Sequence, residues 1–252
     1  MNTDIIYGTR AVMEAIRAGK EIEKVMIQSG LANDLVKELI AMARKHQVPY
    51  TFVPQEKLKR FTTKNHQGVV CQLASVAYAS LDNLIDRAYG EGREPFLLVL
   101  DRITDVRNFG AIARTAECAG VDGIVISDKG NAPITSDAMK TSAGALNHLA
   151  VCREKDLKQT MRYLRENGIR IIACTEKTNQ SLFNVPLTGP IALIMGSEED
   201  GVSDVLLRDA DELVRIPLHG KIGSLNVSVA TGIAVYEVVR SRGGGKDAGK
   251  MT

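Results

Sequence analysis

The sequence predicts an α/β protein with a parallel sheet in a large C-terminal domain and a small α/β domain before it. From residue 95 onward, short apolar runs without strict alternation are interleaved with helical stretches, a pattern typical of a parallel sheet covered on both faces. Before residue 78, shorter strands and amphipathic helices alternate. A polar segment that contains two glycines separates the two parts and indicates a domain boundary.

Composition is that of an ordinary globular protein. The 252 residues are 44% hydrophobic and 25% charged, enough for one large or two small domains. Because the net charge is only +2, any binding of nucleic acid must come from local patches or motifs. The four cysteines are far apart and form no CxxC pair, so neither a disulfide framework nor a metal site is expected. No stretch resembles a signal peptide or a membrane span, and we expect a cytoplasmic protein without membrane contact.

The first domain is expected to span residues 1–77. Periodicity predicts helices over 6–19, 31–47 and 55–61, and strands over 22–28, 49–54 and 68–78. Residues 78–94 are expected to be a linker that contains a short helix.

The second domain is expected to span residues 95–242, followed by a Gly/Lys-rich tail, 243–252, that we expect to be disordered. Its predicted strands cover 96–101, 123–127, 149–152, 170–175, 191–196 and 212–217. Ligands of parallel sheets bind at the carboxyl ends of the strands, so the segments after these strands are the candidate sites. No GxGxxG follows any of them, which argues against a standard dinucleotide site.

Two of these segments carry polar residues in loops that lead into helices. After the first strand, Asn108 is placed to cap a helix that begins near Phe109, and Arg114 follows six residues later. After the strand at 191–196, the acidic pair Glu198 and Glu199 lies in a glycine-flanked turn, before a helix capped by Ser203 or Asp204. From the residues alone, a plain cap with a surface arginine is an equally open interpretation of the first segment, and a solvated turn is the favoured interpretation of the second.

The third segment, GSLNVSVATG, opens the last helix. Ser224 and Asn226 stand where this helix begins, and a helix N-terminus suits a polar or anionic ligand. The spacing predicts that this helix buries the face formed by Leu225, Val229, Ile233 and Tyr236.

A basic stretch lies in the first domain. Around Phe61 and His66 it contains the cations Lys57, Lys59, Arg60 and Lys64. Clustered cations with an aromatic ring suit an RNA backbone and a stacked base, but a solvated helix face is an equally open interpretation.

Read together and in order, NFGAIAR, IMGSEEDG and IPLHGKIGSLNVSVATG resemble the SpoU/TrmH branch of the SPOUT RNA methyltransferases, across residues 95–240. IIYGTRAVMEAI and KNHQGVV resemble the small ribosomal-protein-like substrate-binding domain of the ribosomal-RNA guanosine 2′-O-methyltransferases in this group. The resemblance implies a deep trefoil knot in the parallel-sheet domain, the cofactor S-adenosyl-L-methionine (AdoMet), a homodimer, and large-subunit ribosomal RNA as the partner.

The resemblance also implies site residues. Cofactor contacts map to Thr175, Gly196, Ile216 and Leu225, and catalysis maps to Asn108, Arg114, Glu198, Ser224 and Asn226. Since a guanidinium stays protonated, we expect Arg114 to hold a phosphate and stabilise developing alkoxide charge rather than act as a base. Glu198 and Asn226 are expected to orient Arg114 and the loops, and Asn108 and Ser224 to position the ribose or the methionine end of the cofactor.

Three alternatives remain at this point. A tRNA 2′-O-methyltransferase of the same family is the nearest, although the separate first domain argues for ribosomal RNA. A non-catalytic RNA-binding assembly factor on the same scaffold is the second. A nucleotide hydrolase is the third, but the chain lacks both a phosphate loop and a nucleophile–base pair.

Overall fold

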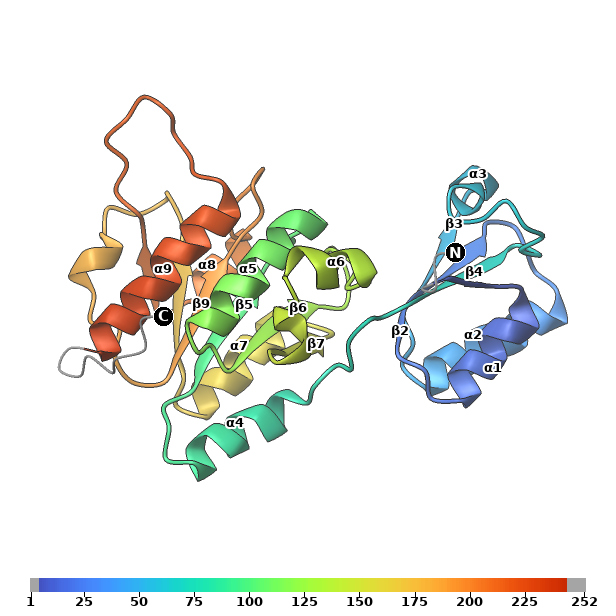
Figure 1. Cartoon of the computed structure of the whole chain (residues 1–252), viewed down its shortest axis with the longest axis horizontal. Coiled ribbons are helices and arrows are strands. Elements are labelled where there is room, and N and C mark those ends of the chain that lie inside the picture. Colours follow the sequence, from blue (N-terminus) through green and yellow to red (C-terminus); the bar gives the residue numbers. More distant parts are fainter. Residues whose placement is uncertain (1–4, 244–252) are drawn as a thin grey trace. The chain divides into compact units, whose positions relative to one another are not determined.

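The structure, a computed structural model, describes residues 5–243 and divides into two compact units (Figure 1). The first unit contains the chain up to Ala77 together with Pro133–Asp137, and the second contains Tyr78–Ala132 and the chain from Ala138 onward. Each unit has its own sheet and its own apolar core. The predicted tail, 243–252, lies outside the described residues from residue 244 on.

The first unit alternates strands and helices: β1 (Ile5–Tyr7), α1 (Thr9–Arg17), β2 (Ile22–Gln28), α2 (Asp34–Lys45), β3 (Tyr50–Val53), α3 (Gln55–Lys59) and β4 (Val69–Leu73). The strands form one mixed sheet in the order β1-β4-β2-β3. Because side chains alternate along a strand, Val25 and Ile27 of β2 pack with α1 and α2. Met26, between them, joins a smaller cluster with Leu58 of α3. The sheet is therefore covered on both faces.

Two predicted boundaries in this unit are wrong. The helix predicted over 6–19 begins only at Thr9, because Ile5–Tyr7 form the edge strand β1. Gly8 separates the two elements with φ at +89°, a backbone conformation that favours glycine. The strand predicted over 68–78 ends at Leu73.

The second unit contains six strands: β5 (Phe96–Leu100), β6 (Gly123–Ser127), β7 (Ala150–Glu154), β8 (Arg170–Cys174), β9 (Ile191–Met195) and β10 (Glu212–Val214). Its α-helices are α4 (Leu81–Gly90), α5 (Val106–Cys118), α7 (Leu157–Glu166), α8 (Asp204–Asp209) and α9 (Val227–Arg242), together with most of α6 (Ser136–Thr141), whose first two residues are counted with the first unit. Two short 3₁₀ helices cover Ala145–Asn147 and Leu182–Asn184. The predicted strands are thus all present, with β10 shorter than expected.

The six strands form one sheet with the order β10-β8-β9-β5-β6-β7, and every pairing within it is parallel. Helices α4, α7 and α8 share an apolar core with one face of the sheet. Helices α5 and α9 pack against each other over the other face (Figure 1). The expected α/β fold with a doubly covered parallel sheet is confirmed, and the trefoil knot implied by the resemblance stays a prediction.

The segment expected to be a linker, 78–94, is part of the second unit. Its helix α4 buries Leu81, Leu84, Ile85 and Ala88, and the first three belong to the core beneath the sheet. The polar residues that suggested a linker form the outer face of an amphipathic helix, which a composition argument does not separate from a connector.

The buried face predicted for α9 is also wrong. Val229 and Tyr236 are each 51% exposed, whereas Val227, Ala234, Val235 and Val238 face the core. α9 is apolar on more than one side, and periodicity does not tell which apolar stripe meets the sheet. The helix ends at Arg242, which donates hydrogen bonds to the carbonyl oxygens of Glu94 (3.1 Å) and Pro95 (3.0 Å) at the start of β5. Among residues 5–243, no helix combines the length and apolar character needed to cross a membrane.

The packing of α4 gives the first prediction. Replacing Ile85, which is 1% exposed, by alanine removes buried apolar volume and should lower the free energy of unfolding by about 2–5 kcal/mol. Urea denaturation followed by circular dichroism measures this loss. Arg87→Ala, on the exposed face of the same helix, is the control and should change stability by less than about 0.5 kcal/mol. Equal effects of the two variants would contradict the placement of α4 in the core.

Candidate active site

A cavity of about 380 Å³ opens at the carboxyl ends of β8, β9 and β10. Its walls come from the loop after β8, the turn after β9 and the segment between β10 and α9. The four residues implied for the cofactor, Thr175, Gly196, Ile216 and Leu225, all line it. The cavity therefore lies at the edge of the sheet where ligands of parallel sheets bind.

The turn after β9 is closed by hydrogen bonds within itself. The backbone N–H groups of Ser197 and Gly201 donate to each other's carbonyl oxygens, at 3.1 and 3.0 Å, and the Asp200 N–H donates to Ser197 Oγ. A Cβ at Gly196 would lie 2.0 Å from the backbone carbon of Gly201. Only glycine therefore fits the end of this strand, and the following residues are held in one short turn.

Three of the predicted catalytic residues meet through their side chains. Asn108 Nδ2 donates to Glu198 Oε1 at 2.8 Å, and Asn226 Nδ2 donates to the same oxygen at 2.7 Å and to Asn108 Oδ1 at 3.0 Å. Within residues 5–243, Glu198 Oε2 accepts no hydrogen bond. Glu199 makes no side-chain hydrogen bond in the same part of the chain, so the geometry distinguishes the two neighbouring glutamates. We call Asn108, Glu198 and Asn226 the polar trio.

The capping of the two helices explains how the trio is held. The expectation that Asn108 caps α5 is wrong, because Asp105 is the cap and accepts from the N–H groups of Arg107 and Asn108. Because Asp105 caps the helix, the side-chain amide of Asn108 is free to donate its hydrogen bond to Glu198. Asn226 does cap α9, since its Oδ1 accepts from the N–H groups of Ser228 (2.9 Å) and Val229 (3.4 Å) while its Nδ2 reaches the trio.

Ser224 and Arg114 make no side-chain hydrogen bond with the trio within residues 5–243, so the expected orientation of Arg114 by Glu198 and Asn226 is not present. Ser224 lines the 380 Å³ cavity. Arg114 is exposed on α5 and lines neither this cavity nor its neighbour. That neighbour, about 320 Å³ in volume, is lined by residues of the loop after β5 and by Asn108, and it shares Glu198 with the first cavity. Glu198 thus stands in the wall between the two cavities.

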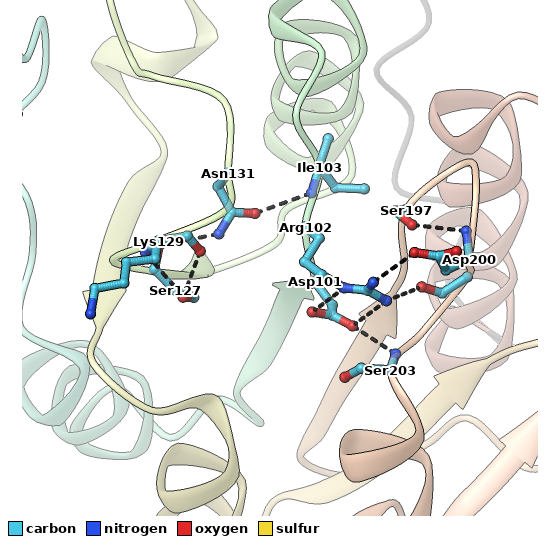
Figure 2. A network of polar contacts seen from close by, with 10 residues as sticks. Asp101, Arg102, Ile103, Ser127, Lys129, Asn131, Ser197, Asp200 and Ser203 are labelled. Atoms are coloured by element: carbon cyan, nitrogen blue, oxygen red, sulfur yellow. Dashed lines mark hydrogen bonds and ion pairs between the residues drawn. The ribbon is translucent and has the colours of Figure 1, made fainter. Parts of the chain in front are cut away.

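Sequence reasoning missed a polar clamp at the end of β5 (Figure 2). Buried Asp101 accepts from the Ser203 N–H at 2.7 Å, and the Arg102 guanidinium donates to Asp200 Oδ2 (2.9 Å) and to the Gly201 carbonyl oxygen (3.0 Å). Arg102 also pairs with Asp101 and has φ at +59°, which is strained for a residue with a side chain. The signal in the sequence is an acid–base pair directly after a buried strand. The clamp fixes both sides of the turn that carries Glu198.

Acidic groups dominate the larger cavity. Glu176, Glu198, Glu199 and Asp200 line it, with Arg215 as the one cation in the lining. Cys174 also lines it, and burial raises the pKa of its thiol to about 12. The thiol is therefore neutral near pH 7 and is not set up as a nucleophile.

The predicted RNA contacts lie in the first unit. Lys57, Lys59, Arg60 and Lys64 are all exposed, and Lys64 Nζ stands 5.7 Å from the centre of the Tyr7 ring. His66 is buried, and its Nδ1 accepts from the Gly68 N–H, so it shapes a turn instead of extending the basic surface. Phe61 is partly buried in the cluster around Leu58.

Comparison with known families identifies both parts of the chain. The model of the SpoU rRNA Methylase family matches residues 95–236, and the model for RNA 2′-O ribose methyltransferase substrate binding matches residues 5–79. The chain belongs to the SpoU rRNA methylase family. It is an AdoMet-dependent RNA 2′-O-ribose methyltransferase.

Individual relatives agree with this assignment. The TrmH family tRNA/rRNA methyltransferase YacO of Bacillus subtilis is 34% identical over 239 residues, which cover 95% of this chain and 96% of YacO. The AdoMet-bound rRNA methyltransferase from Sinorhizobium meliloti has a TM-score of 0.59 at 25% identity, covering 94% of this chain and 87% of that one. The TrmH/SpoU tRNA modifying enzyme of A. aeolicus has a TM-score of 0.54 at 27% identity, and the match covers 64% of this chain and 83% of that enzyme's chain.

The larger cavity of this SpoU methyltransferase fits AdoMet chemically. AdoMet carries two cationic groups, a sulfonium and an ammonium, and the carboxylates of the lining suit them. Ile216, Leu218 and Leu225 offer apolar surface for the adenine ring. The missing Cβ of Gly196 lets the backbone of Gly201 and Val202 pass close to it, which shapes the wall of the cavity. Within residues 5–243, no cluster of three or more His, Cys, Asp or Glu side chains is arranged to hold a metal ion.

The polar clamp formed by Asp101 and Arg102 leads to a prediction for cofactor affinity. Arg102→Met removes the donors that hold Asp200 and Gly201, so the turn in the cavity wall should loosen and AdoMet affinity should fall about tenfold (~1.4 kcal/mol). Isothermal titration calorimetry measures the affinity. Arg208→Met, an exposed arginine on α8, is the matched control and should bind AdoMet as the wild type does. Unchanged affinity in Arg102→Met would show that the clamp does not position the turn.

Proposed function

We propose that the enzyme methylates the ribose 2′-hydroxyl of a guanosine in large-subunit ribosomal RNA. The observation that carries the proposal is the polar trio beside the cavity that fits AdoMet, in a chain that also has a substrate-binding domain. The guanosine rests on the resemblance of the N-terminal segments to the guanosine-specific branch of the family. We further propose that the enzyme works in the cytoplasm, where this RNA is found.

The trio supplies orientation. When bound, AdoMet provides the methyl group. Glu198 and Asn108 line the neighbouring cavity, which we assign to the acceptor nucleotide. The unused Oε2 of Glu198 and the second amide hydrogen of Asn108 are available to a ribose, so these groups can align the 2′-oxygen. Ser224, in the wall of the cofactor cavity, positions the methionine end of AdoMet.

Arg114 has an electrostatic role in this proposal. A guanidinium remains protonated in proteins, so it stabilises the charge that develops on the 2′-oxygen and holds the adjacent phosphate, while water takes the proton. Arg114 is exposed and makes no side-chain hydrogen bond or ion pair within residues 5–243. Its charge is therefore available to RNA.

The choice of ribosomal RNA over tRNA rests on chain coverage. The Sinorhizobium meliloti rRNA methyltransferase matches 94% of this chain, whereas the A. aeolicus tRNA modifying enzyme matches 64%. The name of the B. subtilis relative includes both substrates, which keeps a tRNA 2′-O-methyltransferase as the second candidate. We propose that Lys57, Lys59, Arg60 and Lys64 bind the RNA backbone from the first unit.

Mass spectrometry of RNA from a deletion strain tests the substrate. One 2′-O-methylguanosine should be missing from large-subunit ribosomal RNA, and it should return when the gene is restored. Loss of a methyl group from tRNA alone would replace this proposal by the tRNA alternative. A non-catalytic assembly factor would leave all methyl groups in place.

Arg114→Ala should abolish methyl transfer and leave AdoMet affinity nearly unchanged, since Arg114 lines neither cavity. Single-turnover transfer of labelled methyl groups and calorimetry measure the two effects. Arg162→Ala, an exposed arginine on α7, serves as the control. If transfer by Arg114→Ala stays within about tenfold of the wild type (~1.4 kcal/mol), the assigned role is wrong.

We also propose a homodimer formed through α9. Val229 and Tyr236 expose half of their apolar surface on this helix, next to the cofactor cavity that Val227 and Ala230 line. Val229 and Tyr236 are seven residues apart and so lie on the same face of the helix, and large apolar side chains exposed together on one face suit an interface between proteins.

Tyr236→Glu should therefore dissociate the protein into monomers, because a buried unpaired carboxylate is costly. Analytical ultracentrifugation measures the state of association. Val205→Glu is the control, because Val205 is 49% exposed on α8, at the opposite face of the sheet. A dimer that survives Tyr236→Glu, or a wild-type monomer, would overturn the proposed interface.

A further inference from the structure

A third cavity, about 300 Å³ in volume, opens at the carboxyl ends of β5, β6 and β7. It lies along the same edge of the sheet as the cofactor cavity. Its walls include Lys129 after β6, Lys155 and Lys158 around the start of α7, and residues of α8. None of the predicted site residues lines it.

The three lysines carry charge that the described residues do not neutralise. Lys129, Lys155 and Lys158 are exposed, and their ammonium groups make no ion pair within residues 5–243. The other cation in the lining, Arg102, is paired with Asp101 and Asp200. One carboxylate, Asp156, lies among the lysines and accepts from the N–H groups of Lys158 and Gln159. The cavity therefore has an excess of positive charge.

The backbone at Lys129 is fixed by side-chain hydrogen bonds (Figure 2). Lys129 N–H donates to Ser127 Oγ at 3.1 Å, and Ser127 Oγ donates back to the Lys129 carbonyl oxygen at 2.8 Å. Asn131 ties this turn to the loop after β5, because its Oδ1 accepts from the Ile103 N–H at 3.1 Å. Lys155 and Lys158 flank the cap of α7. Their positions are thus defined by secondary structure, while their side chains remain adjustable.

The chemistry favours a polyanion over a small enclosed anion. Asp156 already occupies the first N–H groups of α7, so the cavity offers exposed ammonium groups and not a cage of buried donors. Lysines of this kind act as point charges toward backbone phosphates and neutralise them without reading sequence. With a net charge of +2 for the whole chain, such local excess charge is what binding of RNA requires.

The three cavities are connected by shared residues. Glu198 lines both the cofactor cavity and the neighbouring cavity that also contains Asn108, and Arg102 lines both that neighbour and the lysine cavity. We propose that Lys129, Lys155 and Lys158 bind the backbone phosphates of the RNA segment that flanks the methylated nucleotide. This inference rests on the proposed function, because it assigns the path of that substrate.

The test compares variants of the full chain that neutralise exposed positive charges, and the loss of affinity is compared per charge removed. Lys129→Gln/Lys155→Gln/Lys158→Gln is set beside the control Arg162→Gln/Arg208→Gln, which removes exposed charges from the same unit outside the cavity. The probe is an unmodified large-subunit rRNA transcript, with unmodified tRNA as a second probe. Dissociation constants are measured over a range of KCl concentrations, and thermal melting and AdoMet calorimetry verify folding.

The triple variant should bind RNA more weakly, with a log–log salt slope smaller by about 2, since each lost phosphate contact removes about 0.7 for single strands. Its KM for RNA should rise while kcat and AdoMet affinity stay unchanged. A photo-crosslinking amino acid at position 155 should mark nucleotides beside the methylated ribose.

Equal slopes for the triple variant and the wild type, or an equal loss per charge in the control, would overturn the inference, as would crosslinks remote from the methylated ribose. If the wild type binds RNA but methylates none, the proposed function fails, and the salt slopes still decide whether the lysines contact RNA. If the wild type methylates and the triple variant keeps its KM, only the inference fails.

Discussion

The position of β9 between β8 and β5 is the constraint on which the site depends. All five residues of β9 are at most 3% exposed, and the strand pairs in parallel with a neighbour on each side. Moving the end of this strand would therefore require breaking two ladders of hydrogen bonds. Gly196 passes directly from the strand into a turn with no room for a Cβ. A side chain as exposed as Glu198 is consequently held in a defined place, between the cofactor cavity and the end of β5.

Asn226 joins stability to function at the other side of the site. Its Oδ1 caps α9, a contact of the kind that contributes about 1 kcal/mol to stability, while its Nδ2 donates to Glu198 and Asn108. One amide therefore satisfies the helix and orients the trio, because its oxygen accepts while its separate NH₂ group donates. The short polar residues Ser224, Asn226 and Ser228 at the start of this apolar helix thus have separate roles. Asn226 is both cap and site residue, Ser228 supports its oxygen, and Ser224 faces the cavity.

The sequence predicted the sheet and the strand ends well because both depend on local patterns. The apolar runs located all six strands of the second unit, and the rule for parallel sheets placed the lining of the cofactor cavity after β8, β9 and β10. Features that depend on tertiary packing were not predictable in the same way. The capping of α5 by Asp105 instead of Asn108, the exposed side of α9 and the burial of α4 each depend on which of two acceptable local options the packing selects. The contacts of Arg102 could not be predicted, because its partners Asp200 and Gly201 lie in a turn about a hundred residues away in the sequence.

The exposure of the polar groups has an electrostatic consequence. Glu198 and Asn226 are open to solvent, and water competes for their hydrogen bonds, so the trio by itself contributes little free energy. Once a ligand covers these groups and excludes water, the same contacts act in a medium of lower dielectric constant and become stronger. The lysines around the third cavity behave in the opposite way, since they remain solvated and act through counterion release. A site of this kind separates two requirements: affinity for a polyanion comes from exposed charge at a distance, and orientation comes from short contacts that strengthen only when substrate is in place.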